Sequence, residues 1–232
     1  MTEARRATAR PAPYDAACTR CPRLAGFLEE TRARHPLYWA RPVPSFGAER
    51  PRILIVGLAP GMHGANRTAR PFTGDHAGIL LYQSLFDAGL ASAAVSVSAD
   101  DGLKLRNVRI ANAVKCVPPQ NKPLPAEIRC CNAYLAAELR GLAGVRVLLA
   151  LGRVAHEAVL LAQKLPRGRY AFAHAAEHRL SAAHVMLDSY HCSRYNTQTR
   201  RLTTPMFRAV LARACELAQL PVPEGLRLTH GS

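Results

Sequence analysis

Arg52-Ile53-Leu54-Ile55-Val56-Gly57 is a short apolar run that ends in glycine. Such a run is typical of a parallel strand that is buried on both faces. Similar runs follow at residues 107–116, 145–151 and 184–188, and helical patterns occupy residues 16–34, 77–90, 125–142, the segment after Gly152, and 204–220. Alternating strands and helices predict an α/β fold, a three-layer α/β/α sandwich around a mostly parallel sheet.

Three loops in this pattern follow the carboxyl ends of predicted strands. The first begins at Gly57, the second covers residues 112–116, and the third covers residues 189–196. Ligand sites in open α/β sheets lie beyond these strand ends, so we expect the functional site where the three loops meet.

The composition of the 232-residue chain indicates a globular protein with an anionic partner. Lys and Arg number 31 against 16 Asp and Glu, a net charge of +15. This charge favours nucleic acid first and an acidic membrane surface second, although Arg-rich composition also accompanies GC-rich coding. We expect a basic arm over residues 1–14, one domain over 15–220 and a tail over 221–232. The chain shows no membrane-spanning run or secretory signal, and we expect a cytoplasmic monomer.

Four cysteines are candidate metal ligands. Cys18 and Cys21 form a C-x-x-C pair, and Cys116 and Cys131 lie far downstream. Four thiolates can hold a [4Fe–4S] cluster, but a C-x-x-C pair also suits zinc or a redox dithiol, and free cysteine is common in cores. Cys130 directly precedes Cys131 and could compete for the fourth position. Spacing alone leaves these alternatives open.

The loop that begins at Gly57 carries several candidate ligand-binding residues. It lacks the order of glycines found in dinucleotide sites and the G-K-[ST] of a P-loop. Its arginines, Arg67 and Arg70, could meet phosphates, and Phe72 could stack on a flat ring or pack in the core. Asp75 is the only carboxylate in this loop, and a helix N-cap is its alternative role.

The last loop contains His191-Cys192-Ser193. A histidine at the end of a strand can donate a hydrogen bond to developing negative charge, although a lone histidine is more often structural. Ser193, Arg194 and Asn196 could contact phosphates.

Taken in their order along the chain, the motifs resemble those of the uracil-DNA glycosylase superfamily, specifically the iron–sulfur-containing family 5 (type b). The resemblance runs from about Cys18 to Leu220. The matching segments are the Cys18/Cys21 pair, Gly57-Leu-Ala-Pro-Gly61, Arg70-Pro-Phe-Thr-Gly-Asp75, Asn112-Ala-Val-Lys-Cys-Val-Pro-Pro119, Cys131-Asn-Ala-Tyr-Leu135, Ala150-Leu-Gly-Arg153 and His191-Xaa-Ser193. Ala59 and Asp75 distinguish this pattern from that of family 4, which carries a polar residue at the first position and lacks the second.

The resemblance implies a repair enzyme that removes uracil from DNA, and with it other deaminated bases such as hypoxanthine and xanthine. It implies a [4Fe–4S] cluster on Cys18, Cys21, Cys116 and Cys131. His191 would stabilise the departing base anion, and Asp75 would stabilise the cationic sugar and orient water. The expected substrate-binding residues are Gly57, Ala59, Gly61, Phe72, Asn112 and Ser193, with Asn121 as a substitute for Asn112.

The chain departs from the family at Cys192, where the family has proline, and this removes a constraint on the backbone beside His191. Two other classes of protein fit parts of the pattern. A non-catalytic iron–sulfur DNA-binding damage sensor would explain the charge and the cysteines, and a zinc-stabilised nucleotide-binding protein would explain the cysteines and the glycine-rich loop.

Overall fold

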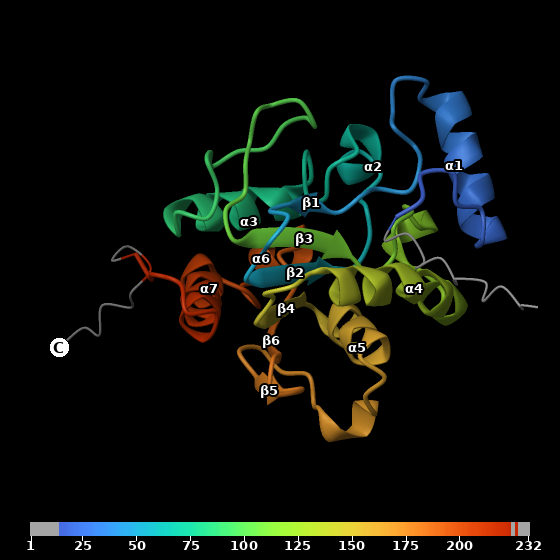
Figure 1. Ribbon diagram of the computed structural model, residues 1–232. Coiled ribbons are helices and arrows are strands. Elements are labelled where there is room, and N and C mark those ends of the chain that lie inside the picture. Colours follow the sequence, from blue (N-terminus) through green and yellow to red (C-terminus); the bar gives the residue numbers. More distant parts are fainter. Residues whose placement is uncertain (1–13, 224–225, 227–232) are drawn as a thin grey trace, which may run out of the picture.

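The computed structural model describes residues 14–223 and Leu226. Its centre is a six-stranded sheet in the order β1-β3-β2-β4-β6-β5 (Figure 1). The four inner strands are parallel: β2 (Ile53–Gly57), β3 (Val108–Asn112), β4 (Val147–Leu151) and β6 (Val185–Ser189). The edge strands, β1 (Phe46–Gly47) and β5 (Glu177–Arg179), pair antiparallel to their neighbours. The predicted α/β class and mostly parallel sheet are confirmed, and the two edge strands were not predicted.

Helices cover both faces of the sheet because alternate residues of each inner strand point to opposite sides. Ile53 and Ile55 pack in one core with α3 (His76–Asp87) and α7 (Thr204–Leu217). Leu54 and Val56 pack in the other with α4 (Pro125–Gly141) and α5 (Arg153–Ala162). Strand β2 is fully buried, as its uninterrupted apolar sequence predicts.

A third, smaller core lies at the end of the sheet, under α1 (Pro22–Arg34). Leu24 and Leu28 of α1 pack there against Val114, Val117 and the cysteine-bearing segments. The predicted helix over residues 16–34 begins only at Pro22, whose fixed φ favours the first helical turn, with Cys21 as the N-cap residue. Residues 16–21 are therefore free to form the loop that carries Cys18.

The remaining elements are short. They are α2 (Ala65–Thr68), α6 (Arg194–Gln198) and the 3₁₀ turns η1 (Pro119–Asn121) and η2 (Arg167–Arg169). The predicted strand over 107–116 ends at Asn112, and its remainder becomes the loop that carries Cys116. Among the described residues, no helix is long and apolar enough to cross a membrane.

A buried polar network fastens β5 and α5 to β6. The Asp188 carboxylate is fully buried and accepts from His156 Nδ1 at 2.9 Å and from His178 Nε2 at 3.1 Å. This network replaces the apolar packing that the edge of the sheet would otherwise need.

The predicted termini lie mostly outside the described residues. Of the arm over 1–14, only Tyr14 is described, and its hydroxyl donates to the Pro42 carbonyl at 2.7 Å. Of the tail over 221–232, residues 221–223 and Leu226 are described, and Leu226 is buried in the core beside α7.

Candidate active site

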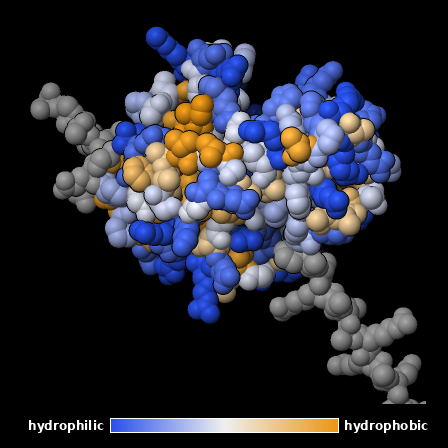
Figure 2. Space-filling model, turned by 90° about the horizontal axis from the view of Figure 1, so that it is seen from above, coloured by the Kyte–Doolittle hydropathy of each residue, from blue (hydrophilic) through white to orange (hydrophobic). Residues whose placement is uncertain are grey.

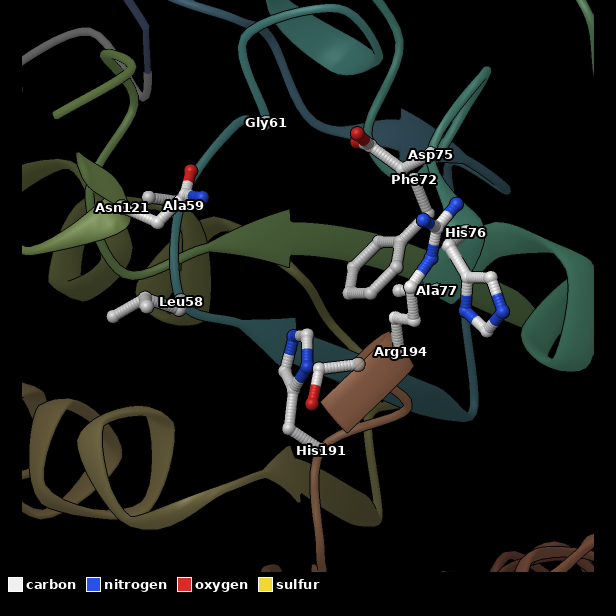
Figure 3. A pocket seen from close by; sticks show the side chains of 11 residues that line it. Leu58, Ala59, Gly61, Phe72, Asp75, His76, Ala77, Asn121, His191 and Arg194 are labelled. Carbon is white, nitrogen blue, oxygen red and sulfur yellow. The ribbon is translucent and has the colours of Figure 1, made fainter. Parts of the chain in front are cut away.

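A cavity of about 440 Å³ opens at the carboxyl edge of the sheet (Figure 3), where the three loops were predicted to meet, but the loop over 112–116 contributes no residue to its lining. It is lined by Leu58, Ala59, Gly61, Phe72, Asp75, His76, Ala77, Asn121, His191, Ser193 and Arg194. Six of the eight residues predicted for catalysis or substrate binding are therefore in its wall. The other two, Gly57 and Asn112, lie outside the wall, and Gly57 is next to both Asn112 and Phe72: a Cβ on Gly57 would stand 2.6 Å from Asn112 Oδ1 and 2.7 Å from the Phe72 ring.

The Asp75 carboxylate is turned toward the glycine-rich loop and away from its own helix. It occupies the N-cap position of α3 but makes no side-chain cap hydrogen bond, so the alternative role as a helix cap is wrong. Instead, the carboxylate accepts from the backbone amides of Ala65, at 3.1 Å, and Gly61. Two amide donors hold the carboxylate at a fixed place in the cavity wall.

The glycines of the loop leave space for this carboxylate. A Cβ on Gly61 would stand 2.2 Å from Asp75 Oδ1, and one on Gly64 would stand 1.9 Å from it. Burial raises the pKa of Asp75, and the two amides and the positive charge of Arg67 oppose that rise. The loop thus partly buries the carboxylate while supplying hydrogen bonds to its charged form.

Phe72 has a left-handed backbone conformation, with φ of 60°. A bulky residue at positive φ stores strain, which persists only where neighbours fix it. Here, the Tyr82 hydroxyl donates to the Pro71 carbonyl at 2.7 Å, and the Thr73 hydroxyl contacts Ser96 Oγ at 2.7 Å. The Phe72 ring faces the His191 ring, with 5.9 Å between centroids and an angle of 29° between planes.

Arg70 does not serve the cavity. Its guanidinium is buried, pairs with Asp101, donates to Ser96 Oγ and the Ala99 carbonyl, and stacks on the Phe46 ring. The expectation that Arg70 meets a phosphate is therefore wrong, because its guanidinium N–H groups already donate hydrogen bonds to the long segment between α3 and β3. Arg67 remains exposed.

His191 stands opposite Asp75 in the cavity (Figure 3). Asn196 Nδ2 donates to the His191 carbonyl at 2.9 Å, and Ser193 Oγ accepts from the Asn196 amide at the start of α6. The loop is therefore held by hydrogen bonds although proline is absent, and Cys192 fills a fully buried position. Burial lowers the pKa of His191 to about 4, which makes its ring a neutral imidazole at neutral pH.

Two amide side chains stand in or beside the wall of the cavity. Asn112, at the end of β3, is buried, and its Oδ1 has no hydrogen-bond partner. Asn121 lines the cavity on the same side as Ala59 (Figure 3), from a turn in which Gln120 and Asn121 both have positive φ. An orphaned buried acceptor and a strained turn are both features of ligand sites.

Sequence reasoning missed His76 as a lining residue, whereas Arg194, which it named as a possible phosphate contact, is in the wall. Asp75, the neighbour of His76, drew attention as a motif member, but nothing in the periodicity showed that the first residue of α3 would face the cavity. His76 Nδ1 is buried without a partner.

The cysteines form a second site, beneath α1. Cys18, Cys21, Cys116 and Cys131 line one small cavity, together with Cys130, Arg20, Lys115 and Tyr134. The side chain of Cys131 is buried, and its Sγ accepts from the Lys115 amide at 3.3 Å. Cys130 is half-buried, and its Sγ lies 3.9 Å from the Arg20 carbonyl.

These thiols perturb one another because they are close and partly buried. Burial raises the pKa of Cys116 strongly, and the charges of Cys131, Cys18 and Cys21 raise it further. Burial likewise raises the pKa of Cys21 to about 12, with a contribution from Cys130. Cys18 differs: burial opposes ionisation, but hydrogen bonds from Tyr134 and Arg20 lower its pKa. A positive ion or cluster would relieve this mutual repulsion.

The spacing of the sulfur atoms separates a cluster from a single zinc ion. Within the described part of the chain, no three of these sulfurs lie within 4.8 Å of one another. A single tetrahedral zinc ion, with Zn–S near 2.3 Å, would place its sulfurs about 3.8 Å apart. The donor set therefore fits a larger, thiolate-bound iron–sulfur group better than one zinc ion.

Comparisons with known proteins agree with this arrangement. Residues 44–215 match the family model described as the uracil DNA glycosylase superfamily. A protein of Thermus thermophilus named type-5 uracil-DNA glycosylase is 49% identical over 209 residues, covering 88% of this chain and 95% of the relative. A type-5 uracil-DNA glycosylase of Mycobacterium bovis is 43% identical over 87% of this chain and 78% of its own length. A type-4 uracil-DNA glycosylase of Archaeoglobus fulgidus is 36% identical over 49% of each chain.

Proposed function

The chain belongs to the uracil-DNA glycosylase superfamily, and from this membership we propose that it hydrolyses the N-glycosidic bond of uracil in DNA. The product is an abasic site. The observation that carries the proposal is the pairing, across one cavity, of a carboxylate held by loop amides with a neutral imidazole. Asp75 and His191 are the two groups that glycosidic cleavage requires.

The target base must leave the duplex to reach this cavity. Phe72, Asn112 and Asn121 then recognise it: the ring of Phe72 stacks on the base, and the two amides can donate to and accept from its polar edge. Asn112 Oδ1 has no partner in the protein, so a base N–H would satisfy it.

Cleavage places positive charge on the sugar and negative charge on the base. His191 donates a hydrogen bond to the base anion, since its ring is neutral and keeps one N–H. The Asp75 carboxylate stabilises the cationic sugar and orients the attacking water, as carboxylates do in sugar hydrolysis. The amides of Gly61 and Ala65 keep that carboxylate in place and oppose the rise in its pKa that burial causes.

We also propose that the enzyme accepts deaminated purines, hypoxanthine and xanthine among them. The wall beside the base is built from small residues, Ala59, Gly61 and Ala77, and the cavity of about 440 Å³ has room for a second ring. All of these residues come from one chain, so the proposed reaction needs no second copy.

We propose that Cys18, Cys21, Cys116 and Cys131 hold a [4Fe–4S] cluster. The convergence of four thiols and the spacing of their sulfurs support it. When bound, the cluster cross-links the start of α1, the loop after β3 and α4. Cys131 is preferred over Cys130 because its sulfur is buried and accepts from the Lys115 amide.

The test is single-turnover base release from oligonucleotides that carry one uracil, hypoxanthine or xanthine, with an undamaged oligonucleotide as the control. We expect release of all three damaged bases and none from the control. Tight binding to damaged DNA without any base release would instead establish the non-catalytic damage sensor.

A further inference from the structure

A second cavity, of about 450 Å³, adjoins the active-site cavity and shares His191 and Leu58 with it as walls. Its other lining residues come from the end of β4, the start of α5, the segment before β5 and the segment after β6, among them Arg153, Phe172, Tyr190 and Arg201. None of its described lining residues is acidic. The mechanism above uses none of them except His191.

The two arginines are exposed, and each lies over an aromatic ring. The Arg153 Cζ lies 5.6 Å from the centre of the Phe172 ring, and the Arg201 Cζ lies 4.6 Å from that of Tyr190. In the described part of the chain, neither arginine forms an ion pair with a carboxylate. The cation–π contacts favour these positions of the guanidinium groups and leave their N–H donors available to a ligand in the cavity.

The start of α5 packs closely against the His191 loop in the wall between the two cavities. Gly152, with φ of 96°, lets the start of α5 approach the His191 loop so closely that a Cβ there would stand 3.4 Å from His191 Cβ. Its amide donates to the Ser189 carbonyl at 2.8 Å. The position of Arg153 is thus tied to that of His191, which contacts the target base in the proposed reaction.

An anion suits this cavity better than a nucleobase. The Tyr190 ring already stacks on His174, with centroids 5.0 Å apart, and also carries the Arg201 guanidinium. A base would have to displace these partners, whereas a phosphate would meet two oriented guanidinium groups, the side chain that binds phosphate with most geometric specificity.

We propose that the second cavity binds the backbone phosphate of a nucleotide that adjoins the target in the same strand, with Arg153 and Arg201 as its contacts. The proposal rests on the proposed function, because it takes the neighbouring cavity as the place of the flipped base. The phosphate would hold the strand on one side of the extruded nucleotide, so that His191 meets its base in register.

The experiment is a thermodynamic cycle between protein and DNA. Oligonucleotides carry a stable abasic analogue and one neutral methylphosphonate, placed in turn at each of the two phosphates on either side of the analogue. Dissociation constants are measured at fixed salt for the wild type, Arg201→Gln and, as a matched control, the exposed neighbour Arg200→Gln, which does not line the cavity.

In the wild type, we expect a methylphosphonate at one position to weaken binding roughly 10-fold or more, the range of hydrogen bonds to charged groups. The same methylphosphonate should cost Arg201→Gln clearly less, because only Arg153 still contacts the phosphate, while Arg200→Gln should keep the full loss. Additive losses at all four positions would overturn the proposal. Arg153→Gln, read by the same cycle, replaces Arg201→Gln if that variant does not fold.

The two proposals fail separately. Wild-type uracil release with additive losses at every phosphate would remove the phosphate site and leave the enzyme. Coupling at one phosphate without any base release would keep the site and remove the proposed catalysis.

Discussion

The candidate active-site cavity and the cysteine site lie at the same end of the sheet but differ in whether their polar groups have partners. In and beside the cavity, polar atoms of His76 and Asn112 are buried without partners, and Phe72 is held at positive φ. Around the cysteines, the charged groups are paired: Arg23 with Glu127 at 2.7 Å, and Lys115 with Glu138 at 3.4 Å, beside Ser45. We interpret the unsatisfied groups at the cavity as partners for a substrate, and the paired groups around the cysteines as stabilising contacts.

Removing a cluster ligand should therefore have the largest effect of all on stability. We expect Cys131→Ala to lose most of its iron and to unfold at a lower temperature, because a tight ligand at 1,000 times its dissociation constant contributes about 4 kcal/mol. Cys130→Ala is the matched control and should keep iron and thermal midpoint. Iron analysis and thermal unfolding check both variants; loss of iron in Cys130→Ala alone would assign the fourth ligand to Cys130.

Removing His191 should act on chemistry and spare the fold. We expect His191→Ala to slow single-turnover uracil release by about 10²-fold to 10³-fold, the usual cost of one donor to a developing anion. The loss for hypoxanthine should be a different factor, because the two leaving groups differ in acidity and shape. Affinity for abasic DNA should change little, since phosphate contacts dominate it. An unchanged rate with weak abasic-DNA binding would make His191 a DNA-gripping residue.

Adding one methyl group at each of two glycines, one beside the cavity and one in α1, compares the two sites. In Gly64→Ala, the new Cβ would stand 1.9 Å from Asp75 Oδ1, so the carboxylate must move. A displacement of about 1 Å can cost up to about 10²-fold in rate, and we expect a loss of 10-fold or more. Gly26 of α1 has nothing within 4 Å of its Cβ position. Gly26→Ala should keep the rate and gain about 0.5–1 kcal/mol in stability. Equal rates in the two variants would show that the position of Asp75 does not matter.

The smallest effect that we predict is on the pH dependence of folding stability. The pKa of His191 falls from 6.5 to about 4 on folding, so below pH 6.5 the unfolded chain takes up a proton that the folded chain refuses. The stabilisation from the neutral ring is complete above pH 6.5 and is lost as pH falls toward 4. His191→Gln should therefore lose less stability than the wild type between pH 6.5 and 4 in denaturant titrations. Parallel losses in the two proteins would contradict burial of a neutral ring.

The sequence predicted those features that follow from pattern. Apolar runs located the four inner strands, and their carboxyl ends located the cavity. It could not predict β1 and β5, because two- and three-residue edge strands have no periodicity of their own. Nor could the sequence predict that the Asp75 carboxylate turns away from α3 to the amides of Gly61 and Ala65, or that the Arg70 guanidinium forms an ion pair with Asp101. Those outcomes depend on contacts between loops whose conformations sequence spacing does not encode.

The contrast between the two sites is tested most directly by the single-turnover rate of uracil release in Asp75→Asn, with thermal unfolding and DNA affinity measured on the same preparation. Asparagine keeps the size of the side chain, removes its charge and turns an N–H toward amides that now donate to a carboxylate. Asp87→Asn, at the other end of α3, is the control and should keep the wild-type rate. We predict a loss of roughly 10²-fold or more in rate for Asp75→Asn, with iron content and DNA binding retained. A near-wild-type rate in a folded Asp75→Asn protein would contradict the assignment of this cavity as the catalytic site.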